Sequence, residues 1–114
     1  MITDDMLRGF TKKAETIYSP SELSQLKSEL DPRVHSIIDN TIDYASRYGV
    51  TFTSRKDVCA VIGKSSAGLI WAERSGTFPK AIPIQPGRVA HSDLRVAAMN
   101  AMIMNASLVQ QEVA

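Results

Sequence analysis

The residues whose types could support catalysis are few in this chain of 114 residues, and they are scattered. Gly63, Lys64 and Ser65 match the end of a phosphate-binding loop, but Val58 stands where that loop requires its first glycine. Asp39 and Asp43 lie four residues apart, a spacing typical of one helix face, without a histidine, cysteine or glycine loop as partner. We therefore predict no catalytic residue and do not expect an enzyme.

Metal and redox chemistry have equally little support in the sequence. Cys59 is the single cysteine, so an internal disulfide cannot form, and the two histidines are too far apart for a zinc site of the usual spacing. We predict a small core side chain at Cys59. For His91 we predict a strand-end residue satisfied by the backbone rather than a pH switch. No metal and no cofactor are expected.

Composition places the chain among ordinary folded proteins. Hydrophobic residues make up 44% and charged residues 22%, which argues against wholesale disorder. No apolar run approaches the ~18–20 residues of a membrane span. The first five residues lack the basic start and apolar block of a secretory signal. We therefore expect a cytoplasmic protein with no membrane contact.

The distribution of charge points to a partner, although the net charge is only +1. Residues 1–50 carry six Lys or Arg and eight Asp or Glu, whereas residues 51–95 carry seven and three. Beyond them, Glu112 is the only charged residue. A basic middle between acidic or neutral flanks predicts a polyanionic partner, and double-stranded DNA is the one we expect.

Residues 1–49 are predicted to form an N-terminal segment of short helices, for oligomerisation or binding of a protein partner. Thr3, Ser19 and Asp31 fit helix starts, and a proline follows two of them directly. The apolar stripes must be buried on each other, on the rest of the chain or on a second subunit. These stripes are Met6, Leu7, Phe10, Ala14, Ile17 and Tyr18; Leu23, Leu26 and Leu30; and Val34, Ile37, Ile38, Ile42 and Ala45.

Residues 50–92 are predicted to form a winged helix-turn-helix. Residues 50–53 read as a strand, Ser54 starts a helix, and Gly63 ends it. Ser65 starts a second helix that stops at Gly76, and a hairpin with Pro86-Gly87 at its tip follows. The fold class is therefore mostly α, a winged helix-turn-helix with an N-terminal helical extension and a long apolar C-terminal helix.

Residues 93–114 are predicted to form that C-terminal helix and a tail. The helix starts at Ser92-Asp93, runs to about Leu108 and is apolar nearly all round. Because the winged unit offers it one groove, the N-terminal helices of the same chain or of a partner must cover the other face. We expect self-association, in a homodimer or higher oligomer. Two recognition helices would then meet successive major grooves about 34 Å apart. The expected interface residues are Leu94, Met99, Met102 and Ile103.

Four segments of the basic region resemble one family. They are Val58-Cys59-Ala60-Val61-Ile62-Gly63-Lys64-Ser65, Ser75-Gly76-Thr77-Phe78-Pro79-Lys80, Gly87-Arg88-Val89-Ala90 and Ser92-Asp93-Leu94. This pattern resembles the AlpA-like phage regulators, relatives of excisionases and of the MerR-type winged helix, over residues 51–98. The resemblance implies a DNA-binding regulator of phage or mobile-element type, either a transcriptional regulator or a recombination directionality factor.

The DNA-binding residues expected from this reading lie on the two helices and the wing. The start of the recognition helix faces base edges, Arg88 lies just past the wing tip, and the remaining cations contact phosphates. Trp71 either stacks on a sugar or base or packs half-buried. The full set is Arg55, Lys56, Lys64, Ser65, Ser66, Ala67, Trp71, Arg74, Lys80 and Arg88.

The chain departs from the family pattern on the recognition helix. Family members usually place arginine at Ser66, Ser-Thr at Ala67-Gly68, Tyr-Arg at Ile70-Trp71 and tryptophan at His91. Long polar side chains that read bases are therefore missing. Two interpretations follow: backbone contacts and DNA shape carry the recognition, or the winged helix serves as a protein–protein interaction module.

Overall fold

The computed structural model describes residues 1–113, and Ala114 of the predicted tail lies outside them. The prediction of a mostly helical chain is confirmed. The α-helices are α1 (Asp4–Glu15), α2 (Pro20–Leu26), α3 (His35–Tyr48), α4 (Arg55–Ile62), α5 (Ser66–Ser75) and α6 (Asp93–Val113). The strands are β1 (Phe52–Ser54), β2 (Ile82–Gln85) and β3 (Arg88–Ser92), and two 3-10 turns are η1 (Lys27–Glu29) and η2 (Pro32–Val34).

The predicted N-caps are present at four helix starts. The hydroxyls of Thr3, Ser19, Ser54 and Ser65 accept backbone N–H groups three residues on, at 3.0–3.3 Å. Asp31 differs, because it caps the 3-10 turn η2 through the N–H of Arg33 at 2.9 Å, and α3 begins only at His35. Local capping chemistry therefore sets most helix starts along this chain.

The strands form one antiparallel sheet in the order β1-β3-β2. Thr53 pairs with His91, and Pro83 pairs with Val89 on the edge strand β2, where its missing N–H is tolerated. Thr51 and Thr53 donate their hydroxyls to the carboxylate of Asp93, and the N–H of Asp93 donates to Thr51 O at 3.1 Å. These contacts fix the start of α6 to the sheet.

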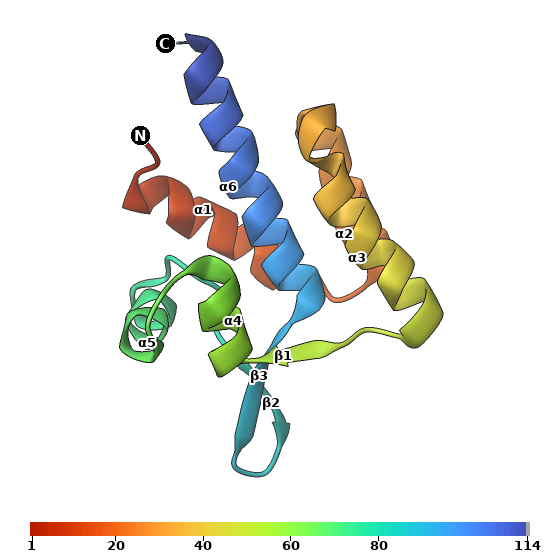
Figure 1. The fold of residues 1–114 in the computed structure, drawn as a ribbon, viewed down its shortest axis with the longest axis vertical. Helices are drawn as coiled ribbons and strands as arrows, with labels where there is room; N and C mark the ends of the chain where they lie inside the picture. The colour runs from red at the N-terminus through yellow and green to blue at the C-terminus, as the bar shows by residue number, and fades with distance from the viewer. Residues whose placement is uncertain (114) are drawn as a thin grey trace.

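Helix α6 lies between α1 on one side and the α2–α3 pair on the other (Figure 1). It ends at Val113 rather than near Leu108, and its 21 residues are not apolar all round, which corrects that part of the prediction. Asn100 and Asn105 interrupt its apolar faces. Among the described residues, no helix has the length and hydropathy that a membrane span requires.

The larger core is formed by the N-terminal helices and α6. Leu94, Met99 and Met102, which the sequence assigns to an oligomer interface, are at most 3% exposed here. A single chain therefore covers them, without a second copy, while Ile103 is partly buried beside them. The buried set is Ala14, Ile17, Leu23, Leu26, Ile38, Leu94, Ala97, Ala98, Met99, Ala101 and Met102.

A second, smaller core lies between α4, α5 and the segment that follows α5. We call residues 55–81 the α4–α5 unit. This core consists of Val58, Cys59, Leu69, Ala72 and Phe78, with Val96 of α6 packed against it. Cys59 is a buried core side chain, as the sequence predicts. The two cores meet along the first turns of α6, so this helix positions α4 and α5 relative to the N-terminal helices.

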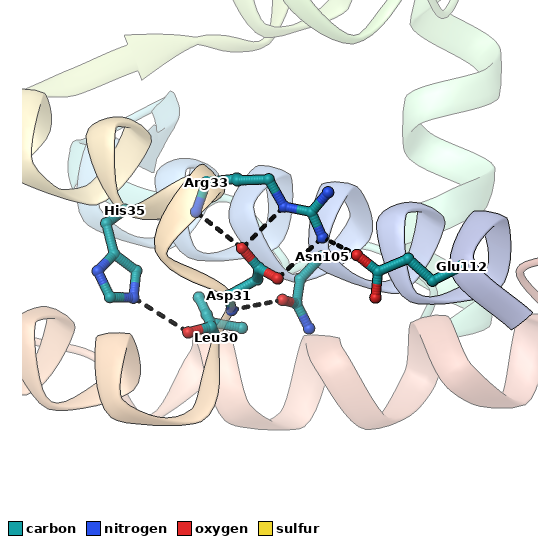
Figure 2. Close-up of polar contacts among 6 residues, drawn as sticks. All are labelled: Leu30, Asp31, Arg33, His35, Asn105 and Glu112. Carbon is teal, nitrogen blue, oxygen red and sulfur yellow. Dashed lines mark hydrogen bonds and ion pairs between the residues drawn. The ribbon is translucent and has the colours of Figure 1, made fainter.

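Polar contacts attach the η2 connection to the far end of α6 (Figure 2). The Nη2 atom of Arg33 bonds both Asp31 and Glu112, and the side chain of Asn105 accepts the N–H of Asp31 at 2.7 Å. The hydrogen bonds from Arg33 lower the pKa of Asp31 to about 2. The last turns of α6 are therefore held by side chains from before α3.

Candidate nucleic-acid interface

Helix α5 presents one face to the core and the opposite face to solvent. Leu69, Ala72 and Glu73 are buried. The opposite side of α5 carries Ala67, Ile70, Trp71 and Arg74, which follow one another at helical spacings of three and four residues or are adjacent. We call these four residues the outer face. Trp71 is 70% exposed. Of the two interpretations of Trp71, the structure supports the accessible side chain and not the half-buried one.

A tight turn connects α4 to α5. Gly63 ends α4 in the left-handed conformation with φ of 70°, which glycine adopts without steric cost. The chain then reverses so that Lys64, Ser65 and Ser66 are exposed at the start of α5. The predicted base-reading end of the helix is therefore open to solvent, although its only long polar side chain is Lys64.

The cations of the α4–α5 unit and of the β2–β3 hairpin differ from those of the N-terminal helices in how many of them form ion pairs. Around the N-terminal helices, Arg8, Lys13, Lys27, Arg33 and Arg47 each pair with a carboxylate. Within residues 1–113, five exposed cations of the other region form no ion pair: Lys56, Lys64, Arg74, Lys80 and Arg88. Lys12 of α1 is the comparable unpaired cation elsewhere. Positive charge available to a partner is therefore concentrated around α4, α5 and the β2–β3 hairpin.

Arg55, a predicted phosphate contact, has a partner inside the protein. Its Nε and Nη2 atoms donate to the two carboxylate oxygens of Glu73 at 3.0 and 2.8 Å, and this hydrogen bonding raises the pKa of Arg55. A two-point pair of this kind fixes the guanidinium in place. Arg55 therefore acts inside the unit, where it joins the start of α4 to α5.

Glu73 is the residue that the sequence reading missed. It is 5% exposed and also accepts the N–H of Ala81 at 3.0 Å. Burial acts to raise the pKa of its carboxyl, but the hydrogen bonds from Arg55 and Ala81 outweigh that effect and leave the pKa lowered. One signal was available: Glu73 is the single acidic residue of α5, and it shares a face with Leu69 and Ala72.

His91 completes this buried polar cluster from β3. It is 1% exposed, and its Nε2 lies 3.1 Å from Pro79 O and 3.5 Å from Glu73 Oε2. Because a carbonyl only accepts, Nε2 carries the proton. Burial lowers the pKa of the imidazole. The prediction of a backbone-satisfied His91 is confirmed for Nε2 only, because Nδ1 has no hydrogen-bond partner within residues 1–113. The cluster holds the base of the β2–β3 hairpin against α5.

Two hollows border the outer face of α5. Lys64 and Trp71 line one of them, against residues of α1 and α6 that include Ile103. Arg74 and Lys80 line the other, beside Ile70 and the Arg55–Glu73 pair. The structure thus brings the predicted residues together in two groups along α5. Arg88 lies apart at the wing tip, and Lys56 lies on the first turn of α4.

Within residues 1–113, no group of three or more histidine, cysteine, aspartate or glutamate side chains could hold a metal ion. Comparison with protein-family models, curated proteins and solved structures gives no match to this chain.

Proposed function

We propose that residues 50–92 form a winged helix-turn-helix that binds double-stranded DNA, in a regulator of phage or mobile-element type. The observation that carries the proposal is the set of five cations that are unpaired within residues 1–113: Lys56 on α4, Lys64 in the turn before α5, Arg74 on α5, Lys80 before β2 and Arg88 at the start of β3. Exposed cations without internal partners are available to replace the counterions of DNA phosphates. The resemblance to the AlpA-like regulators supports the same function.

In this proposal helix α5 and the β2–β3 hairpin contact different parts of the DNA. Helix α5 enters the major groove, with Lys64 and Arg74 directed to phosphates at its two ends. Arg88 at the tip of the β2–β3 hairpin reaches a phosphate or the minor groove. The buried Glu73, through its bonds to Arg55 and to the backbone of Ala81, keeps α4, α5 and the wing in fixed relation, so the contacts act together.

The direct test is the salt dependence of binding to a fluorescent duplex, followed by anisotropy. Arg88→Gln is expected to weaken binding to all sequences alike and to reduce the slope of log K against log salt by about 1. Lys12→Gln is the matched control, because Lys12 is an unpaired cation outside the proposed interface. Absence of binding at low salt, or equal losses in both variants, would contradict the proposal.

A second candidate function is a protein–protein interaction module. The observation in its favour is the apolar character of the outer face, together with Val61, which is 66% exposed near the same hollow as Trp71. Under this alternative, random and genomic duplexes do not bind at low salt. Trp71→Ala would then disturb capture of a protein partner while leaving the circular dichroism spectrum unchanged.

We also propose that two copies occupy one DNA site, since a twofold pair places two α5 helices in successive major grooves. Leu94, Met99 and Met102 are covered within each chain, so such a pair has to use other residues. On residues 93–112 of α6, the large exposed apolar side chains are Met104 and Val109. Light scattering of the protein with and without duplex measures the number of copies.

A further inference from the structure

The outer face of α5 is apolar at its centre and charged at its ends. Ala67 and Trp71 are exposed and Ile70 is half-buried, while Lys64 precedes the helix and Arg74 lies in its last turn. The two cations have no ion pair within the described residues. The face therefore has a defined chemistry: an apolar stripe between two positive charges.

This arrangement matches the dimensions of a DNA groove. From Ser66, the first residue of α5, to Arg74 the helix advances about 12 Å, and Lys64 lies two residues before that start. The major groove of B-DNA is about 12 Å wide and is bordered by phosphates. With α5 lying along the groove, the charged ends can therefore reach phosphates that border it while Ala67, Ile70 and Trp71 face the groove floor.

Resting on the proposed function, we propose that the outer face recognises the C5-methyl groups of thymines in the major groove. The thymine methyl is the apolar group that the natural bases present there. Every base pair also presents polar groups there, including thymine O4 and adenine N6 and N7, so the added methyl contact is what favours thymine beneath Ala67, Ile70 and Trp71. The preferred site is therefore rich in thymine beneath the centre of α5.

The length of the stripe limits the number of methyl contacts. From Ala67 to Trp71 the helix advances about 6 Å, which corresponds to roughly two base pairs. The side chain of Trp71 is large enough to cover one further methyl group. We therefore expect discrimination over two or three adjacent base pairs in each site, with no preference in the flanking sequence.

The experiment compares four duplexes of about 20 base pairs, or two helical turns. Their central segments contain A·T pairs, A·U pairs, G·C pairs or G·5-methylcytosine pairs, and their flanks are identical. Replacing thymine by uracil removes only the methyl group, and burial of one methyl group corresponds to about fourfold in affinity. We expect A·U to bind about fourfold more weakly per contacted thymine and 5-methylcytosine to strengthen binding of the G·C duplex.

Variants assign this discrimination to α5. Ile70→Gln and Trp71→Ala are expected to bring the affinities of the A·T and A·U duplexes close together. Val109→Gln, an exposed apolar residue of α6, is expected to keep them apart. Equal affinity of the wild-type protein for the A·T and A·U duplexes would overturn this inference while leaving DNA binding intact. Absence of binding to all four duplexes at low salt would instead overturn the proposed function.

Discussion

At the scale of single residues, Glu73 is the centre of the α4–α5 unit. Its carboxylate bonds Arg55 of α4 and the backbone of Ala81 before β2, and it lies 3.5 Å from His91 of β3. One side chain thus connects three segments that are distant in sequence. A buried polar cluster of this type stabilises one arrangement of its neighbours because every alternative leaves a charge unpaired.

Removal of this carboxylate is expected to destabilise the protein. Glu73→Ala leaves Arg55 and the Ala81 N–H without their acceptor, and breaking a buried pair costs about 3–5 kcal/mol. Since Arg55 is 38% exposed, we expect a smaller loss of about 2 kcal/mol in the free energy of unfolding. Urea denaturation measures it. Glu29→Ala, which breaks a pair of half-exposed side chains, should lose under ~1 kcal/mol, and equal losses would refute the central role of Glu73.

The buried imidazole of His91 predicts a pH dependence of stability. Burial lowers its pKa below the ordinary 6.5, and its Nδ1 has no hydrogen-bond partner within residues 1–113, so protonation would bury an unpaired N–H. The unfolded chain therefore binds the proton first as the pH falls. His91 contributes fully above pH 6.5, and its contribution declines from there down to the lowered pKa.

Urea denaturation from pH 7.5 downward tests the role of His91, with an expected slope of up to ~1.4 kcal/mol per pH unit below 6.5. His91→Gln should remove this decline, whereas His35→Gln should retain it. Glu73 affects stability in a separate pH range. Because its pKa is lowered, its contribution to the free energy of unfolding is lost only as the pH falls below the ordinary value of 4.5. A decline that persists in His91→Gln would assign it to another group.

At the scale of elements, local signals were readable in the sequence and distant pairings were not. The hydroxyls of Ser54 and Ser65 and the glycines at 63 and 76 act within four residues, so the bounds of α4 and α5 follow from them. The pairing of Thr53 with His91 joins residues 38 positions apart, and no local pattern specifies it. The sequence thus predicted a hairpin where the structure has a three-stranded sheet.

The same division applies to the candidate interface. Exposure of Ala67, Trp71 and Arg74 follows from the helical period of α5, which is a local property. The pairing of Arg55 with Glu73 depends on the packing of α4 against α5, so the sequence alone counted Arg55 as free. Charge summed along a chain therefore overstates the cations that remain available to a partner.

Two glycines offer a clean test of the turn between α4 and α5. A Cβ added at Gly63 or at Gly9 of α1 meets nothing within 4 Å, so the two sites differ in backbone conformation and not in space. Gly63→Ala is expected to lower the free energy of unfolding by about 1 kcal/mol, because φ is 70°. Gly9→Ala should raise it by up to ~1 kcal/mol. Chemical denaturation of both variants measures this contrast, which equal effects would contradict.

At the scale of the whole molecule, α6 is shared by two cores. Met99 and Met102 belong to the core of the N-terminal helices, while Val96 packs against the core of the α4–α5 unit. At its far end, Glu112 bonds Arg33, and Gln110 donates to Met1 O at 2.7 Å. The helix that the sequence assigned to a dimer interface thus organises the single chain, which explains how its apolar residues are covered.

Two methionines of α6 allow its packing inside one chain to be tested separately from contacts at its exposed surface. Met102 is 3% exposed and Met104 is 50% exposed, so the same substitution places a carboxylate either in the core or in solvent. Met102→Glu buries a charge without a partner, and we expect it to unfold the chain or to destabilise it by more than ~4 kcal/mol. Met104→Glu should change the free energy of unfolding by at most ~0.5 kcal/mol. Circular dichroism and urea denaturation measure both effects.

Light scattering of the same variants tests whether α6 also joins two copies. A mass near the 12.5 kDa of one chain for the wild type at tens of micromolar would show that the free protein is monomeric and would confine pairing to the DNA complex. A dimeric wild type that Met104→Glu converts to a folded monomer would place the interface on the exposed side of α6. A folded, monomeric Met102→Glu would contradict the intramolecular core, because the structure gives Met102 a packing role inside one chain.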